Sequence, residues 1–217
     1  MVATAADTLV PFASAQHLVL DDVSWDFYER VLAEVGNGAV RVAFDAGRIE
    51  IMSPLPRHEV LAGLADRLLG VLCLELGIDV IGLVSTTFRH RAKQVGLEPD
   101  TCYHIGANAA AGRRLDEAYD ASVHLPPDLA IEVDVTSPSV AREPIHAALG
   151  VPEIWRVRVG SIVCRRLGNG GGYVDVDRSG AFPLLRPGDL WPWALRLRDE
   201  NSVTVLREFQ AWVRQLS

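Results

Sequence analysis

The chain is 217 residues long, with 49% hydrophobic and 23% charged residues, which excludes a wholly disordered protein and is typical of one globular domain. Its formal net charge of −7 argues against tight nucleic-acid binding through bulk electrostatics. Cys73, Cys102 and Cys164 are widely spaced and suggest neither a disulfide framework nor a zinc site. Residues 1–20 lack a basic signal-peptide start, and charges interrupt the apolar stretch 60–76, so we expect a cytoplasmic protein without a membrane span.

The first half of the chain predicts two helices separated by a hairpin. A weakly patterned, loose arm over residues 1–22 comes first, and apolar residues at helical spacing then predict a helix over 24–35. Alternation of apolar and polar residues predicts a hairpin over 39–52 with one buried face, which places Glu50 on the solvated face. A wide apolar stripe predicts the strongest helix over 58–76.

The second half predicts a sheet around one central strand. The expected elements are two short strands, a third strand segment, the central strand DLAIEVDV, a short helix, a hairpin and a final amphipathic helix, at residues 78–84, 86–91, 96–105, 128–135, 140–149, 153–167 and 202–216. This order predicts an α/β protein with a mixed sheet. We expect a core domain over residues 23–180 and a C-terminal extension over 181–217 that packs on it.

Acidic residues lie on predicted strands, where a carboxylate is costly unless it is paired or bound to a metal. Asp100 stands at the start of one strand, and Glu132 and Asp134 leave the same face of the central strand because they are two residues apart. Three such carboxylates on neighbouring strands would form a hard oxygen site for Mg²⁺ or Mn²⁺. The alternative is that Glu132 or Asp134 pairs with an arginine at a strand end, and the spacing alone does not choose between these hypotheses.

Four segments in the same order, IEIMSPLPRHEVLAGLADRLL, GLEPDTCYHI, DLAIEVDVTS and REPIHAALGVPEIWRV, resemble the Uma2 family, which is grouped with the PD-(D/E)xK nuclease-like proteins. The resemblance covers about residues 24–177. It implies a restriction-endonuclease-like fold, which is a mixed β-sheet core flanked by helices, with extra hairpins. It also implies metal-dependent hydrolysis of phosphodiester bonds in DNA.

Matched to the family residue by residue, Asp100 and Glu132 are expected to bind Mg²⁺ or Mn²⁺, with the main-chain carbonyl of Val133 as a third ligand. His58 matches a histidine at the start of the long helix and is expected in the same cleft, with a helix-capping or core-edge role as the alternative. Asp134 stands where active nucleases of this fold often carry lysine.

The helix after the central strand departs from the family pattern. Related sequences often have K-x-P-x-Y there, and this chain has Arg142 and His146 at the matching positions. Arginine supplies charge but cannot act as a general base, whereas His146 or His58 can accept a proton near neutral pH. Lys93, the sole lysine, is a candidate spatial substitute that its spacing does not support.

The leading hypothesis is therefore a metal-dependent DNA endonuclease centred on the three acids. A catalytically inactive protein that binds nucleic acid or a protein partner is the alternative, and a structural dimer whose acids pair with arginines is a third hypothesis. The basic clusters at 89–93 and 113–114 either contact phosphates or form a solvated face. The tryptophan-rich segment 182–193 and the final helix predict a homodimer, unless this segment folds back over the sheet.

Overall fold

A computed structural model of the chain describes residues 16–36, 40–53, 55–84, 86–114, 118–134 and 141–216. The α-helices within these ranges are α1 (Trp25–Val35), α2 (Pro56–Leu76), α3 (Ala109–Gly112), α4 (Arg142–Leu149), α5 (Trp191–Asp199) and α6 (Ser202–Val213). The strands are β1 (Gln16–Leu20), β2 (Arg41–Asp45), β3 (Arg48–Ser53), β4 (Val80–Gly82), β5 (Phe88–His90), β6 (Val95–Leu97), β7 (Thr101–Ile105), β8 (Leu129–Val133), β9 (Glu153–Arg158), β10 (Ser161–Leu167) and β11 (Tyr173–Val176). No helix in this described part is long and apolar enough to cross a membrane.

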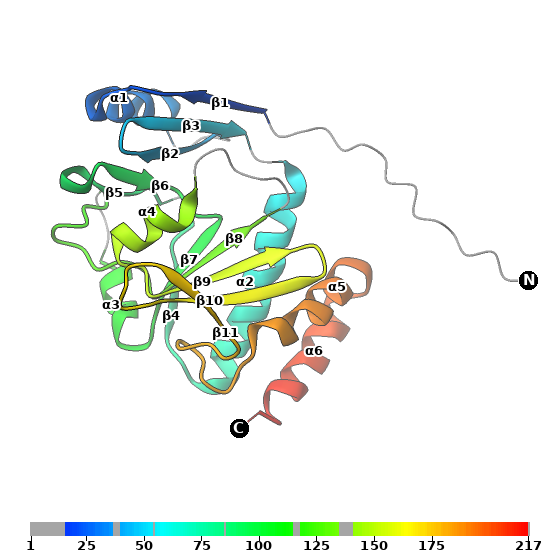
Figure 1. Cartoon of the computed structure of the whole chain (residues 1–217). Helices are drawn as coiled ribbons and strands as arrows, with labels where there is room; N and C mark the ends of the chain where they lie inside the picture. Colours follow the sequence, from blue (N-terminus) through cyan, green and yellow to red (C-terminus); the bar gives the residue numbers. More distant parts are fainter. Residues whose placement is uncertain are drawn as a thin grey trace, which may run out of the picture.

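Two sheets lie side by side (Figure 1). The larger sheet has the order β11-β10-β9-β8-β7-β4, in which β8 and β9 are parallel and the other pairs antiparallel. The smaller sheet has the order β1-β3-β2-β6-β5 and is antiparallel throughout. The predicted α/β class, with a mixed sheet flanked by helices, is confirmed. The second sheet was not predicted, because the hairpin over 39–52 carries no signal for the distant strands that extend it.

Three apolar clusters hold these layers together. The first joins α2, α5 and α6 to one face of the larger sheet, including Trp155. The second lies between the two sheets and includes Ile145 and Leu149 of α4, which therefore sits sandwiched between them. The third joins α1 to the outer face of the smaller sheet through the fully buried Tyr28 and Phe44. Apolar residues at helical and strand periods thus pack on both sides of each sheet.

Local sequence signals explain where several elements begin and end. The Ser24 side chain accepts a hydrogen bond from the Phe27 N–H and caps α1, while Pro56 opens α2 at a position that tolerates proline. Gly77 and Gly150 adopt left-handed conformations at the ends of α2 and α4, where glycine is favoured. The predicted helices over 24–35, 58–76 and 140–149 therefore form with small changes in their bounds.

The smaller sheet corrects two expectations. Glu50 is only 1% exposed, so the prediction that it lies on a solvated face is wrong. The hairpin is buried on both faces because α1 covers one side, while α4 lies against the other. Residues 16–20, expected within the loose arm, form β1 and pair with β3 from Gln16–Ser53 to Leu20–Ile49. Residues 1–15 of that arm lie outside the described residues.

The C-terminal segment folds back on the chain. Pro192 lies in the first turn of α5, a helix that the proline- and tryptophan-rich sequence did not predict. Trp193 and Trp212 pack around the buried Phe209, and both α5 and α6 contact α2. The alternative in which this segment covers the core is therefore the one observed. The reason given for a homodimer is thereby weakened, and the dimer itself stays a prediction.

Candidate active site

Asp100 and Glu132 are brought together by the pairing of β7 with β8. These strands are antiparallel, and the last register pair is Thr101 with Ile131. One step further along lie Asp100 and Glu132, and residues that face each other on antiparallel strands project from the same side of a sheet. Both side chains are buried, with 6% and 5% exposed, and both line a cavity of about 20 Å³.

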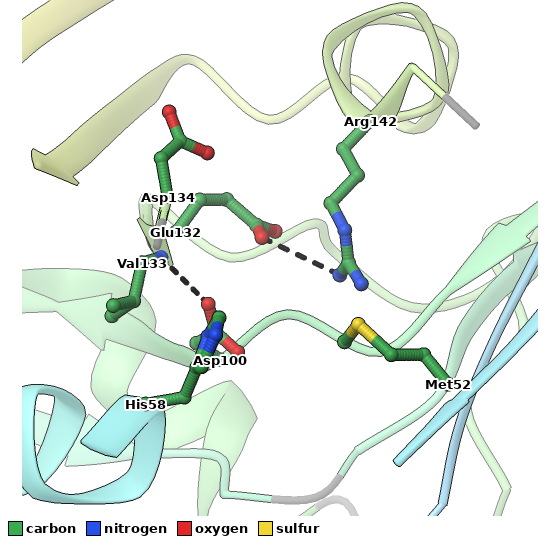
Figure 2. Close-up of a pocket in the computed structure, with 7 residues that line it drawn as sticks. All are labelled: Met52, His58, Asp100, Glu132, Val133, Asp134 and Arg142. Atoms are coloured by element: carbon green, nitrogen blue, oxygen red, sulfur yellow. Dashed lines mark hydrogen bonds and ion pairs between the residues drawn. The ribbon is translucent and has the colours of Figure 1, made fainter. Parts of the chain in front are cut away.

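Most of the site residues predicted from the sequence surround this cavity (Figure 2). Its lining comprises Met52 from β3, His58 from α2, Asp100, Glu132, Val133, Asp134 and Arg142 from α4. Figure 2 shows the Glu132 carboxylate pointing toward Arg142 and the Asp134 carboxylate pointing away from Asp100. The cavity therefore lies where the ends of β7 and β8 meet the first turns of α2 and α4.

Asp100 is held by two donors from different parts of the fold. Its Oδ2 accepts a hydrogen bond of 2.6 Å from the Val133 N–H, and its Oδ1 forms a buried ion pair with Arg41 of β2. Arg41 also binds Glu59 at 2.7 Å, so this guanidinium ties the smaller sheet to α2 across the site. In a strand, the N–H and C=O of one residue point toward the same neighbouring strand. Since the Val133 N–H points toward Asp100, the Val133 carbonyl points toward Asp100 as well.

Glu132 is held by two residues on one face of α4. Arg142 and His146 are four residues apart, and this spacing places both over the strand end. His146 Nε2 lies 2.7 Å from Glu132 Oε1, and Arg142 Nη1 lies 3.4 Å from Glu132 Oε2. Arg142 also donates to the Glu98 carbonyl oxygen at 3.1 Å. His146 is 1% exposed and does not line the 20 Å³ cavity, so it contacts Glu132 on the side away from that cavity.

The two acids differ in their ionisation. Burial, and then repulsion by Glu132, raise the pKa of Asp100 to about 6 despite the opposing Arg41. Burial also opposes ionisation of Glu132, but Arg142 and the hydrogen bond from His146 outweigh it and hold the pKa of Glu132 below its usual value. The repulsion between the two carboxylates opposes the ionisation of Asp100, while Arg41 and Arg142 favour the charged forms of both acids.

His58 brings two unused hydrogen-bonding atoms to the cavity. The side chain is 3% exposed, and neither Nδ1 nor Nε2 has a hydrogen-bond partner among the described residues. Burial and the positive charges of Arg57, Arg41 and Arg142 lower the pKa of His58, so the imidazole is neutral at pH 7. A buried imidazole without partners normally binds a water molecule, an ion or a substrate group.

Asp134 lines the cavity but is committed to other partners. Its carboxylate is ion-paired with Arg156 and, at 3.2 Å, with Arg158 Nε, both on β9. The parallel register of β8 and β9 sets Glu132 beside Arg156, which places both arginines on the same side of the sheet as the acids. For Asp134, the alternative of an arginine pair at a strand end is therefore the arrangement observed.

The remaining basic candidates lie elsewhere. Lys93 Nζ donates to the Ala148 carbonyl at 2.6 Å, at the far end of α4 from Arg142. Arg91 pairs with Asp26 and Glu29 in the cluster at 89–93, and Arg113 pairs with Asp79 in the cluster at 113–114. Each of these two arginines is thus neutralised within the chain.

The donor types suit a hard divalent cation. Within the described ranges, no three His, Cys, Asp or Glu side chains form a group that could hold a metal ion by themselves. Mg²⁺, however, is usually bound by one or two carboxylates together with waters and substrate phosphates. Two buried carboxylates and a main-chain carbonyl on their side fit that requirement.

Sequence reasoning missed Arg41 and Met52. Arg41 stands on the polar side of the alternating pattern in the hairpin and so reads as solvent-exposed, although it is 7% exposed. Arg41 lies near Asp100 because β2 pairs with β6, the strand just before Asp100 in the chain. A single sequence does not reveal the pairing of such distant strands.

Comparisons with known proteins identify the family of the chain. The Uma2 family model, described as "Putative restriction endonuclease", matches residues 25–199. A solved structure, "a putative nuclease belonging to DUF820 from Anabaena variabilis", is similar over 78% of this chain and 90% of its own, with 14% identity and a TM-score of 0.43. No curated protein matches the chain. The family model spans most of the sequence, including every element that lines the cavity, and the chain therefore belongs to the Uma2 family.

Proposed function

We propose that the chain is a nuclease that hydrolyses phosphodiester bonds in DNA with the help of Mg²⁺ or Mn²⁺. The observation that carries the proposal is the pair of buried carboxylates, Asp100 and Glu132, which meet at one cavity with an unpartnered imidazole. The Uma2 family description supports a nuclease. The divalent cation and the DNA substrate are the steps that we add.

Each residue at the cavity has a role that follows from its contacts. Asp100, Glu132 and the Val133 carbonyl would hold the cation, which when bound polarises a phosphate and lowers the pKa of a coordinated water. Arg142 faces the cavity and offers N–H donors to a phosphate oxygen, but its guanidinium cannot accept a proton. His58 is the neutral acceptor at the cavity, and 20 Å³ is enough room for about one water molecule beside it.

The structure favours His58 over His146 for handling the proton. His146 Nε2 is already engaged by Glu132, and its side chain does not line the small cavity. Its contacts support a role in positioning Glu132. His58 lines the cavity with both ring nitrogens free of partners among the described residues.

Cleavage assays with single- and double-stranded DNA test the proposal. Wild-type protein should cleave with Mn²⁺, and Asp100→Asn or Glu132→Gln should abolish cleavage while leaving the fold intact, since each removes one charge and little volume. Asp79→Asn, at an exposed aspartate beside the opposite end of β7 from Asp100, is the control and should cleave like wild type. Cleavage that persists in both site variants would show that another centre, or a contaminant, is responsible.

A catalytically inactive binding protein is the second candidate, and one observation favours it. All four carboxylate oxygens of Asp100 and Glu132 already accept contacts from Arg41, the Val133 N–H, Arg142 and His146. Two guanidinium groups thus balance the two acids without a metal.

Calorimetric titration with Mn²⁺ separates the two candidates. A nuclease should bind Mn²⁺ at this site, and Asp100→Asn should remove the binding. Arg142→Lys restores the ammonium group that related sequences carry, and it should raise a weak activity if arginine is a poor substitute. Absence of Mn²⁺ binding and of cleavage, with no gain from Arg142→Lys, would replace the nuclease proposal with the binding protein.

A further inference from the structure

A second and much larger cavity adjoins the site. Its volume is about 430 Å³, and it shares Glu132, Asp134 and Arg142 with the small cavity. The first turn of α4 and the strand β9 supply the rest of its wall, including Glu143 and Arg156. A molecule bound there would contact residues that also line the small cavity, where the reaction is proposed to occur.

The two cavities differ in volume and can therefore hold different groups. About 20 Å³ accommodates roughly one water molecule or an ion, and no organic group. About 430 Å³ falls within the roughly 300–1,000 Å³ that small-molecule sites typically have. The small cavity can therefore hold the cation or a water molecule, and the substrate itself has to occupy the larger cavity or the open surface.

The charges in the larger cavity are paired within the chain. Its lining has three carboxylates and two guanidinium groups: Glu132 faces Arg142, and Asp134 and Glu143 both pair with Arg156, at 3.0 Å for the Glu143 carboxylate. Arg158 and Arg165, outside the lining, pair with Asp134 and Glu143 as well. Such a lining disfavours a second phosphate, which would meet the carboxylates, and a free cation, which would meet the guanidinium groups. It suits a neutral group whose edge carries both hydrogen-bond donors and acceptors.

The wall also offers apolar surface. Ile154, Pro144 and Ala141 line the cavity beside the charged residues, whose side chains supply both hydrogen-bond donors and acceptors. A planar ring with a polar edge matches this combination of flat apolar contacts and hydrogen-bonding groups, and a nucleobase has both features.

We propose that the larger cavity binds the nucleoside next to the reacting phosphate, with its base between Arg156, Glu143 and the apolar wall. The inference rests on the proposed nuclease function and adds to it a subsite for one unpaired nucleoside. A base that is stacked and paired in a duplex cannot enter such a cavity, so the substrate must present an unpaired or extruded nucleotide. Single-stranded DNA is then preferred over intact duplex.

Binding of mononucleotides tests the subsite without any cleavage. The four deoxynucleoside 5′-monophosphates are titrated by calorimetry against the wild-type chain, in parallel with 2-deoxyribose 5-phosphate, which lacks the base. At least one nucleotide should bind about tenfold more tightly than the sugar phosphate. Equal binding of the sugar phosphate would overturn the inference in favour of a phosphate site, and absence of nucleotide binding would overturn it outright.

Two pairs of variants locate the binding. Ala141 is an exposed residue on the cavity wall, so Ala141→Phe fills the cavity and should weaken nucleotide binding at least tenfold, whereas Ala92→Phe at an exposed position elsewhere should not. Arg156→Gln should weaken it about tenfold, and Arg158→Gln should leave it within twofold. Both arginines pair with Asp134, but only Arg156 lines the cavity. Equal effects within either pair would refute the proposed location.

The two proposals can fail independently. Nucleotide binding that depends on Ala141 and Arg156, in a chain that cleaves no DNA, would retain the subsite and remove the nuclease. Cleavage that requires Asp100 but has the same KM in Arg156→Gln and Arg158→Gln would retain the nuclease and remove the subsite.

Discussion

Replacing Asp100 by asparagine measures what the buried carboxylate costs the folded protein when no metal is present. Its pKa rises from the usual 3.8 to about 6, because burial and then Glu132 oppose ionisation more strongly than Arg41 favours it. At about 1.36 kcal/mol per pKa unit, ionising this carboxyl costs about 3 kcal/mol more in the folded protein than in the unfolded chain. Asparagine keeps the shape and removes this cost.

The sign of the effect follows from the pKa values. Below about pH 3.8 the carboxyl of Asp100 is protonated in both states, and no penalty exists. Between about pH 3.8 and 6 the unfolded chain loses the proton while the folded protein keeps it, so stability falls as the pH rises. Above about pH 6 the full penalty of about 3 kcal/mol is present, and about 2 kcal/mol of it develops between about pH 4.5 and 7.5.

Urea unfolding in the presence of a chelator, at several pH values across this range, is the assay. The free energy of unfolding of Asp100→Asn relative to wild type should rise by about 2 kcal/mol between about pH 4.5 and 7.5. The attraction of Arg41 for the ionised carboxylate is already contained in the pKa of about 6, and the lost contacts of the neutral carboxyl do not depend on pH, so the change with pH reports the ionisation of Asp100. Asp199→Asn is the control, because Arg198 lowers the pKa of that exposed carboxyl, so it stays ionised across this range and its difference from wild type should not change with pH. A difference for Asp100→Asn that is equally independent of pH would refute the reasoning.

Three further substitutions test other parts of the structure. Glu153→Ala should lower the free energy of unfolding by about 3 kcal/mol or more, since this buried carboxylate accepts three hydrogen bonds that would be left unsatisfied; urea unfolding measures it. Gly96→Ala should cost about 2 kcal/mol, because a Cβ there would lie 2.2 Å from the buried Tyr28 hydroxyl, whereas Gly70→Ala in the open on α2 should be neutral or stabilising. Lys93→Met should leave DNA cleavage unchanged and cost under about 1 kcal/mol, since its ammonium only caps the end of α4; loss of cleavage would contradict the placement of the site.

Most of the secondary structure was predictable from the spacing of apolar residues. The helix over 58–76 and the hairpin over 153–167 were predicted because their apolar residues repeat at 3.6 and 2 residues over long stretches. The strand over 128–135 was predicted as central from its continuous apolar run, and β8 does lie inside the larger sheet. By contrast, β4 and β5 are three residues each, and α5 begins with a proline that suggests a loop.

Contacts within the candidate site were predictable only between residues on strands that are neighbours in the sheet. Asp100 and Glu132 stand one step beyond a register pair of adjacent antiparallel strands, so their proximity follows from local order in the chain. The ion pairs of Asp134 depend on the parallel pairing of β8 with β9, which brings Arg156 and Arg158 beside it. In the sequence, the only signal for these ion pairs was the alternation of arginine and valine in the RVR segment of β9.

Burial of polar residues was the least predictable feature. Arg41 and Glu50 both occupy polar positions of an alternating hairpin, which normally face solvent. They are buried because α4 and the smaller sheet pack against each other, a contact between segments about one hundred residues apart. A single sequence states which residues share a face of a strand, but it does not state what covers that face.

Arg142 stands where the resemblance to the Uma2 family leads us to expect a lysine. Its Nη1 contacts both the Glu132 carboxylate, at 3.4 Å, and the Glu98 carbonyl oxygen, at 3.1 Å, which leaves the other N–H groups of the guanidinium for further acceptors. A cation held by Glu132 would compete with Arg142 for the same carboxylate, and the displaced guanidinium would face the small cavity, where a phosphate oxygen is its natural partner. Under the proposed nuclease function, the arginine that pairs with Glu132 in this structure would therefore also bind the substrate once a cation occupies the site.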